Sequence, residues 1–285
     1  MKNKNIVILV GANGFIGSHI AKSLTENSIE FNVIGRKNCD LLNLDQVKLF
    51  LSHYMDKSLD IIFTSSIVRR REDTTSAKEK NILMVKNFIE SSKDHAINSF
   101  IYFSSIDVYH NNGVLLNESS KLLPSNPYSV SKIDCENMLE EAFNHNFLTI
   151  FRMPGIYGPG DKFNSIIGNF INSIKQDIPL NITNNGEQLR DYLYVGDVSK
   201  CVLNIIKKPT SELYNLSSGN SLKLISIIKL ISKKLNKEAI IQPSSKDLLQ
   251  KDLKISNSKF LDRFPNFSFT SMDLGIEKYL SRLDG

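Results

Sequence analysis

The apolar positions of the chain follow two periods that alternate along its first half. Short runs rich in β-branched and aromatic residues, typical of buried strands, are separated by longer stretches with the i, i+3, i+4 spacing of an amphipathic helix. Such an alternation forms a parallel sheet through right-handed crossovers, with helices on both faces. The pattern therefore predicts an α/β protein with a doubly wound parallel sheet (Rossmann). Strands are expected at residues 6–10, 31–35, 60–64, 99–104 and 147–152, and helices at residues 15–27, 45–55, 77–93 and 127–144.

This pattern loosens after Arg152, where three glycines and two prolines lie within residues 154–160. Such a composition indicates a boundary between two parts of the chain. Beyond it, predicted helices at residues 164–175, 198–206 and 225–235 are mixed with short extended segments. We therefore expect a smaller C-terminal α/β lobe.

Composition and charge exclude several classes of protein. The 285 residues are 41% hydrophobic and 23% charged, as in ordinary globular proteins. No apolar run approaches the ~20 residues that span a bilayer, so we predict a cytoplasmic protein with no membrane partner. The formal net charge of +5 is dispersed except at Arg69–Arg71. Because no basic stripe with interleaved aromatic residues is present, no nucleic-acid partner is expected.

Two further groups of residues have simple interpretations. Arg69–Arg71 is either a solvated loop face or a contact to substrate phosphates, and both interpretations stay open. The three cysteines, Cys39, Cys135 and Cys201, are odd in number and far apart. We therefore expect reduced structural thiols and no metal site.

A glycine-rich segment, GANGFIG at residues 11–17, lies between the first predicted strand and the first predicted helix. Glycines at this spacing let the main chain approach a pyrophosphate, whose charge is met by the N–H groups at the helix N-terminus. A tight turn without a ligand is the alternative. Since strand and helix flank the segment on the correct sides, we predict a dinucleotide-binding loop. Its cofactor contacts are assigned to Gly11, Asn13, Gly14, Phe15, Ile16 and Gly17.

The end of the second predicted strand distinguishes between the two nicotinamide dinucleotides. An NAD site places a carboxylate there to bind the ribose hydroxyls, whereas a 2′-phosphate is bound by a guanidinium. This chain has Arg36 and Lys37 at that point and no carboxylate between Phe31 and Cys39. Both cations are consistent with ordinary surface residues, but the missing acid favours NADP(H), with NAD(H) still possible.

The segment NPYSVSK, residues 126–132, places Tyr128 and Lys132 on one face of a predicted helix. A tyrosine that exchanges a proton near neutrality needs a pKa well below its usual value of about 10, and an adjacent ammonium lowers it. With nine tyrosines, a Tyr-x-x-x-Lys spacing is expected about once by chance. The motif gains weight from Ser104 and Ser105, which close a predicted strand where a doubly wound sheet binds ligands. One of these serines is expected to bind the substrate oxygen that Tyr128 protonates. The alternative for either serine is a cap of the next segment.

Together these motifs resemble the extended short-chain dehydrogenase/reductase superfamily, and within it the NAD(P)-dependent epimerase/dehydratase family that modifies nucleotide sugars. The resemblance covers nearly the whole chain. Its segments are GANGFIGSHI, CDLLNLD, SSIDVYH, NPYSVSKIDCE, FRMPGIYGPGD, NNGEQLRDYLYVGDV and YNLSSGNSLKLISI, with Asn81 similar to the asparagine that opens the family's fourth helix. It implies a dinucleotide-binding domain of residues 1–153 with a returning segment of about 190–216. A substrate-binding lobe of about 154–189 and 217–285 completes the chain.

The resemblance also implies roles for individual residues. Ser105, Tyr128 and Lys132 are identified as the catalytic set, and Asp40 and Leu41 as cofactor contacts near the adenine. Contacts to the nucleoside diphosphate sugar are assigned to Ser105, Ile106, Asp107, Gly155 and Arg190. Dehydratases of the family place Asp-Glu where this chain has Ile106 and Asp107, which disfavours dehydration. Gly155 replaces an asparagine that contacts the nucleotide in many members, and residues 63–66 replace the usual His-Leu-Ala-Ala.

Three functions are weighed. The first is an NADPH-dependent reductase of a keto nucleotide sugar, such as a 4-keto-6-deoxy-hexose joined to a nucleoside diphosphate. The second is an epimerase with a retained NAD(P) cofactor, which would use the same residues. The third is a non-enzymatic NADPH-binding protein. The resemblance further implies a homodimer through a four-helix contact of residues 77–93 and 127–144.

Overall fold

A computed structural model describes residues 5–143, 148–244 and 251–283. The chain divides into two compact units, and each is described by itself. Unit 1 comprises residues 1–109, 122–152 and 198–214, and unit 2 comprises residues 110–121, 153–197 and 215–285. None of the helices within the described ranges is long and apolar enough to cross a membrane.

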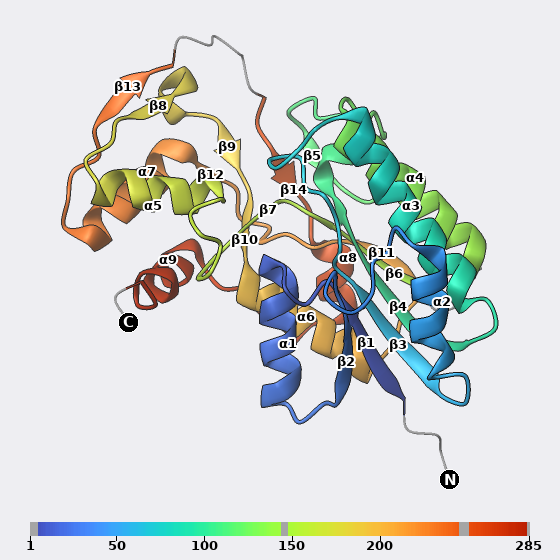
Figure 1. Cartoon of the computed structure of the whole chain (residues 1–285). Helices are drawn as coiled ribbons and strands as arrows, with labels where there is room; N and C mark the ends of the chain where they lie inside the picture. The colour runs from blue at the N-terminus through green and yellow to red at the C-terminus, as the bar shows by residue number, and fades with distance from the viewer. Residues whose placement is uncertain (1–4, 144–147, 245–250, 284–285) are drawn as a thin grey trace. The chain divides into compact units, whose positions relative to one another are not determined.

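A six-stranded parallel sheet forms the centre of unit 1, which confirms the predicted α/β fold class (Figure 1). Its strands lie in the order β11-β6-β4-β3-β1-β2, so that β1 pairs with both β2 and β3. The chain therefore reverses its direction of winding at β1, as a doubly wound sheet requires. The strands are β1 (Ile6–Val10), β2 (Phe31–Ile34), β3 (Ser58–Phe63), β4 (Ala96–Ser105), β6 (Leu148–Met153) and β11 (Glu212–Asn215).

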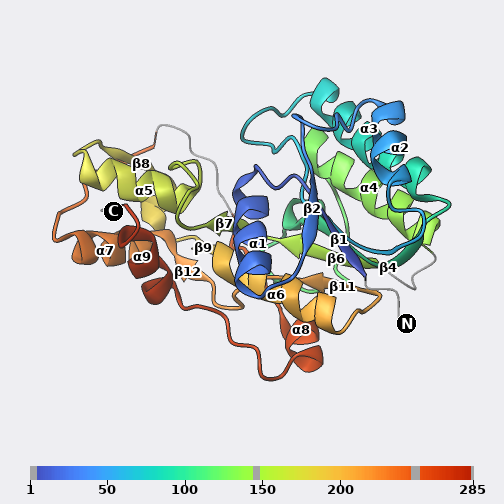
Figure 2. The ribbon, with the colours of Figure 1, turned by 60° about the horizontal axis from the view of Figure 1, so that its bottom comes forward.

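Helices cover both faces of this sheet (Figures 1 and 2). Three of them, α2 (Leu44–Ser52), α3 (Thr75–Ser92) and α4 (Pro127–Phe143), share one face, and α1 (Phe15–Glu26) and α6 (Val195–Lys207) lie on the other. The core beneath the first three contains Val47 and Leu51 from α2, Val85 and Phe88 from α3, and Cys135 and Leu139 from α4. Burial of these apolar side chains against the strands is the main stabilising contribution within the unit.

Local hydrogen bonds explain where the helices begin. Asn43 caps α2 by accepting the N–H of Gln46, and Thr74 caps α3 by accepting the N–H of Ala77. The prediction that the third helix starts at Ala77 was wrong by two residues, because the cap lies at Thr74. Asn81 accordingly lies inside α3 and not at its start. Residues 144 and 147, which closed one predicted helix and opened one predicted strand, lie outside the described residues.

Unit 2 is built from short strands and helices. It contains strands β5 (Leu115–Leu116), β7 (Gly155–Tyr157), β8 (Leu180–Ile182), β9 (Leu189–Arg190), β10 (Tyr192–Tyr194), β12 (Leu222–Lys223), β13 (Ile241–Pro243) and β14 (Lys254–Ile255), and helices α5 (Ile166–Lys175), α7 (Leu224–Leu235), α8 (Ser258–Arg263) and α9 (Met272–Leu280). The strands form four two-stranded sheets, β10-β7, β12-β9, β13-β8 and β14-β5. A core of Ile167 and Ile171 from α5, Ile227 and Ile231 from α7, and Ile276 from α9 holds the helices together.

These strand pairs change two limits of the predicted division. Residues 190–197 were grouped with the dinucleotide-binding part, but β9 and β10 pair with strands of unit 2. Residues 110–121 also belong to unit 2, because β5 pairs with β14. The segment that returns to unit 1 is residues 198–214.

Candidate active site

The glycine-rich loop begins directly at the end of β1, beside the end of β3. Thr64, which follows β3, donates its hydroxyl to the carbonyl of Val10 at 2.7 Å, and Gly11 N–H donates to Ile34 O at 2.8 Å. The loop therefore joins the carboxyl ends of β1, β2 and β3, the place where doubly wound sheets bind nucleotides.

The glycines of this loop form a cradle that side chains would fill. Gly11 has φ +93°, and a Cβ there would lie 2.7 Å from the hydroxyl oxygens of Thr64 and Ser65. A Cβ on Gly17 would lie 2.2 Å from the carbonyl oxygen of Gly11. Gly14 is the N-cap of α1 and offers no capping side chain, and no acidic residue stands in the first turn. The N–H groups at this helix end are thus available to a phosphate, so the loop fits a dinucleotide.

The predicted cofactor residues after β2 lie in a turn at the surface. Arg36 and Lys37 are exposed, while Asn38 fixes the turn by accepting the N–H of Gly35 at 2.9 Å and donating to Val33 O at 2.6 Å. Asp40 is exposed and accepts the N–H of Leu42 at 3.1 Å. Leu41 is buried, and its carbonyl accepts the Asn87 side chain at 2.9 Å. The two cations are therefore accessible to a charged ligand.

Ser104 and Ser105 end β4 and have different partners. Ser104 donates to the carboxylate of Glu136, a buried residue of α4. Ser105 Oγ accepts the N–H of Asp107 at 3.1 Å and thereby caps the short 3-10 helix η1 (Ile106–Val108). The Ser105 side chain also faces Tyr128, since its influence lowers the pKa of that tyrosine. The geometry thus brings Ser105, and not Ser104, to the tyrosine.

Tyr128 lies in the first turn of α4, and Lys132 lies one turn further along. The Lys132 Nζ is 5.5 Å from the centroid of the Tyr128 ring and donates to Phe103 O at 2.7 Å. Ser105, Tyr128 and Lys132 therefore come together in unit 1, as the sequence motif requires. The side chain of Lys132 is 4% exposed.

Burial displaces the protonation equilibria of both residues. Burial, followed by the charge of Asp107, raises the pKa of Tyr128 above its usual range, and the hydrogen bond from Ser105 opposes this change. Burial lowers the pKa of Lys132 to about 8, against the attraction of Cys135 and Glu136. The net shift of the Tyr128 pKa is therefore opposite to the lowering expected from the sequence, and an effect of Lys132 itself stays a prediction.

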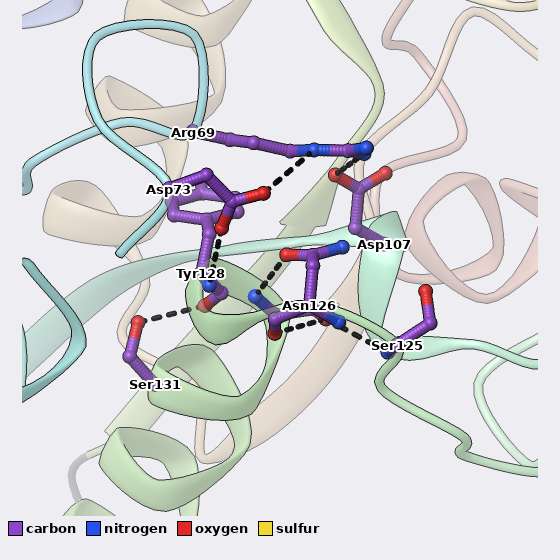
Figure 3. Close-up of polar contacts among 8 residues, drawn as sticks. Arg69, Asp73, Asp107, Ser125, Asn126, Tyr128 and Ser131 are labelled. Atoms are coloured by element: carbon purple, nitrogen blue, oxygen red, sulfur yellow. Dashed lines mark hydrogen bonds and ion pairs between the residues drawn. The ribbon is translucent and has the colours of Figure 1, made fainter. Parts of the chain in front are cut away.

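Asp107 lies beside this set and is held by a residue of the loop that precedes α3. Its Oδ2 is 3.5 Å from Nη1 of Arg69, whose Nε is 3.3 Å from Asp73 Oδ2 (Figure 3). Asp73 Oδ1 in turn accepts the backbone N–H of Tyr128 at 3.1 Å. Ile106, the other predicted substrate contact of η1, is 6% exposed.

A buried ion pair lies behind the catalytic set. Arg152, at the end of β6, donates to Glu136 through Nη2 at 2.5 Å and through Nε at 3.1 Å. Its guanidinium also lies 4.9 Å from the ring centroid of Tyr109. Both charged side chains are almost fully buried, so each requires the other.

Two predicted substrate contacts belong to unit 2. Gly155 faces Tyr192 across the β7–β10 pair, and a Cβ on Gly155 would lie 2.9 Å from the tyrosine ring. Arg190 donates through Nη1 to the carbonyls of Leu189 and Lys251 at 2.7 and 2.8 Å, and burial lowers its pKa. Gly155 is thus explained by close packing, while Arg190 is held by backbone carbonyls.

Several residues of the site escaped the sequence analysis. Asp73, Glu136 and Arg152 were not identified, and Arg69 was seen only as part of a basic run. Arg152 carried a signal, because a charged residue inside the apolar strand segment LTIFRM needs a partner. Glu136 lies one helical turn beyond Lys132, on the face of α4 already assigned to the site. Within the described residues, no cluster of His, Cys, Asp or Glu could hold a metal ion.

Comparisons with known proteins identify the family of the chain and proteins of similar fold. The sequence model of the NAD dependent epimerase/dehydratase family matches residues 7–217. The chain is 26% identical over 267 residues to dTDP-4-dehydro-6-deoxyglucose reductase of Escherichia coli, with 84% of both proteins covered. UDP-glucose 4-epimerase of Thermotoga maritima superimposes with a TM-score of 0.83 at 20% identity, covering 99% of each chain. RMD from Pseudomonas aeruginosa, complexed with NADPH, gives a TM-score of 0.82 at 22% identity, covering 99% of this chain and 100% of that one.

Proposed function

The chain belongs to the NAD-dependent epimerase/dehydratase family, and on this premise we propose that it is an NADPH-dependent reductase of a keto nucleotide sugar. Its class, an NAD(P)-dependent enzyme of the extended short-chain dehydrogenase/reductase type, follows from the family. We propose as substrate a 4-keto-6-deoxy-hexose joined to a nucleoside diphosphate. The relative from Escherichia coli, named dTDP-4-dehydro-6-deoxyglucose reductase, supports this choice.

The convergence of Ser105, Tyr128 and Lys132 at the carboxyl end of β4 is the observation that carries the proposal. Two hydroxyl groups that meet at the carboxyl end of a central strand can both bind one carbonyl oxygen. In the proposed reduction, a bound NADPH supplies the hydride to the carbonyl carbon. Tyr128 Oη–H gives its proton to the carbonyl oxygen, and the Ser105 hydroxyl donates a hydrogen bond to the same oxygen. Lys132, one turn along α4, stabilises the tyrosinate that remains and would hold the cofactor ribose.

The preference for NADPH rests on the turn after β2. Arg36 and Lys37 are exposed there, and the turn offers no carboxylate to ribose hydroxyls before Cys39. A guanidinium binds phosphate oxygens through two parallel hydrogen bonds, which a 2′-phosphate allows and a free hydroxyl does not. Gly11, Asn13, Gly14, Phe15, Ile16 and Gly17 would hold the pyrophosphate, with Asp40 and Leu41 near the adenine.

The residues after Ser105 support reduction over dehydration. Ile106 is apolar and buried, and the Asp107 carboxylate is paired with Arg69. Elimination of water needs an acid and a base next to the reacting carbon. We propose that Asp107 contacts sugar hydroxyls, and that Gly155 and Arg190 contribute to the binding of the nucleoside diphosphate.

Kinetic assays separate the proposed reductase from the alternatives. Purified protein is incubated with dTDP-4-dehydro-6-deoxyglucose, other keto nucleotide sugars and UDP-glucose, each with NADPH or NADH, and the absorbance of the reduced cofactor is followed. We expect stoichiometric oxidation of NADPH by a keto sugar and slower oxidation of NADH. A cofactor that copurifies with the protein, with UDP-sugar interconversion and no net NADPH consumption, would instead identify an epimerase.

Tyr128→Phe tests the catalytic assignment directly. Because the substitution removes only the hydroxyl that moves the proton, we expect turnover to fall by about 10²–10⁴-fold. Binding of NADPH, measured by fluorescence, is expected to remain. Retained turnover would exclude Tyr128 as the proton donor, and retained binding without any turnover in the wild type would indicate a non-enzymatic protein. The homodimer through α3 and α4 remains a proposal, which analytical ultracentrifugation would test.

A further inference from the structure

The loop between β3 and α3 contacts both elements that carry the catalytic hydroxyls. Arg69 lies in this loop, and its guanidinium is within ion-pair distance of Asp107 on η1 and of Asp73, at 3.5 and 3.3 Å. Asp73 accepts the backbone N–H of Tyr128 at the start of α4 (Figure 3). One guanidinium thus connects the residue two places after Ser105 to the first turn of the helix that carries Tyr128.

Other contacts fix the loop on either side of Arg69. Asn81, buried on α3, accepts the N–H of Ile67 at 2.7 Å and donates to its carbonyl at 3.0 Å. Thr74 caps α3 by accepting the N–H of Ala77 at 3.1 Å. The backbone of the loop is therefore anchored to α3 independently of the arginine side chain.

Stability does not account for the position of Arg69. Its side chain is 55% exposed, and those of Asp73 and Asp107 are 29% and 36% exposed. Ion pairs with this exposure are screened by water and salt and contribute little to folding. We therefore look for the role of these ion pairs in their effect on Tyr128 and on the first turn of α4.

The charged and titratable groups that face Tyr128 come from four elements. Asp107 lies on η1, Tyr102 on β4, Lys132 on α4, and Asp73 with Arg69 on the loop. Of these, the Asp107 carboxylate disfavours the phenolate, because two negative charges would lie close together. The guanidinium of Arg69 is placed to cancel that charge.

We propose that Arg69 is a positioning residue for proton transfer: it neutralises Asp107 beside Tyr128 and, through Asp73, holds the first turn of α4 in place. The inference rests on the proposed role of Tyr128 as proton donor. Arg69 touches neither hydroxyl, so it acts on the reaction through Asp107 and Asp73.

Removal of the guanidinium should change the pH at which Tyr128 ionises. Oxidation of the alcohol requires the phenolate as base, so its kcat/KM rises with pH through the tyrosine ionisation. In Arg69→Gln, an unpaired Asp107 opposes the phenolate, and we expect the rise of kcat/KM to move to higher pH by about one unit. At a given pH below the tyrosine pKa, kcat/KM should then be about tenfold lower than in the wild type. The measurement is kcat/KM against pH for oxidation of the alcohol product with NADP⁺.

Four further variants separate charge from structure. Asp107→Asn keeps the backbone N–H that donates to Ser105 and should move the rise to lower pH. The double variant Arg69→Gln/Asp107→Asn should lie closer to the wild type than Arg69→Gln alone, because the carboxylate that Arg69 neutralises is absent. Arg69→Lys should stay near the wild type, and Arg70→Gln, which removes the exposed neighbouring arginine, should coincide with it.

If kcat/KM depends on pH in Arg69→Gln as it does in the wild type, the proposal is overturned. It is also overturned if kcat/KM falls equally at every pH and the additional substitution Asp107→Asn does not restore it. A second measurement is independent of turnover. Amide hydrogen exchange in the first turn of α4 should be faster in Arg69→Gln and unchanged in Arg70→Gln. If Tyr128→Phe remains active, the proposed function fails, and amide hydrogen exchange alone then tests the role of Arg69. Unchanged hydrogen exchange in Arg69→Gln would overturn that role.

Discussion

Two neighbouring serines at the end of β4 belong to two polar clusters of opposite character. Ser104 joins Glu136 and Arg152 in a buried cluster, where the carboxylate accepts from a hydroxyl and from two nitrogens of one guanidinium. Ser105 joins Tyr128 and the half-exposed Asp107 in the candidate site.

The difference between the clusters lies in how completely their charges are compensated. In the Ser104 cluster, an acid and a base are paired with each other, so each buried charge has a partner of opposite sign. In the Ser105 cluster, burial raises the pKa of Tyr128 and lowers that of Lys132 to about 8. Groups with displaced pKa values are typical of sites that exchange protons. We therefore expect the first cluster to govern stability and the second to govern turnover.

Glu136→Ala should give the largest effect on stability. The substitution leaves the Arg152 guanidinium buried without its carboxylate, which typically costs about 3–5 kcal/mol. Urea unfolding followed by circular dichroism measures the change, and Glu141→Ala, an exposed residue of the same helix, is the control. The double variant Glu136→Met/Arg152→Leu should recover most of the loss. A loss below 1 kcal/mol in the single variant would show that the pair is not a major contribution.

Replacing each serine by alanine in turn should show that one cluster affects turnover and the other affects stability. Ser105→Ala removes a donor to the substrate oxygen, so turnover should fall by about 10²–10³-fold. Its free energy of unfolding should fall by only about 1 kcal/mol, the typical cost of losing a helix cap. Ser104→Ala removes a hydrogen bond to a buried carboxylate and should cost about 1.5–3 kcal/mol of stability, with turnover largely retained. Similar effects of the two variants on turnover would contradict the division into two clusters.

Lys132→Met should alter how stability depends on pH. Burial lowers the folded-state pKa of Lys132 to about 8, below its unfolded value, so the unfolded chain binds more protons between these two values. The stability of the wild type relative to the variant should therefore rise with pH above 8, by up to roughly 3 kcal/mol near pH 10.5. Urea unfolding of both proteins at several pH values measures this, and parallel curves would contradict the lowered pKa.

Local patterns predicted the parts of the fold and site that depend on local interactions. The strand at Ile6–Val10 was predicted with its observed bounds, because an apolar run that ends at Gly11 has one plausible structure. Tyr128 and Lys132 were placed together by helical spacing alone. The short strands of unit 2 were not predicted, since two or three residues carry too little periodicity to show a strand.

Contacts between distant segments were beyond prediction. Arg69 and Asp107 are 38 positions apart, and Glu136 and Arg152 are 16 apart, so no local period relates them. The local pattern left the choice between Ser104 and Ser105 open, because both residues end the same strand, and the family resemblance alone identified Ser105 as catalytic. Only the packing of α4 against β4 determines which hydroxyl meets Glu136 and which meets Tyr128.

The position of β11 at the edge of the central sheet has a consequence for synthesis of the chain. β6, whose six residues are all buried, pairs with β4 on one side and with β11 on the other. A ribosome adds residues 212–215 only after residues 110–121 and 153–197 of unit 2 have been translated. Until then β6 is an apolar edge strand, open to pairing with other nascent chains. Premature termination ahead of β11 should therefore yield an aggregating product, even though the glycine loop, Ser105, Tyr128 and Lys132 would all have been made.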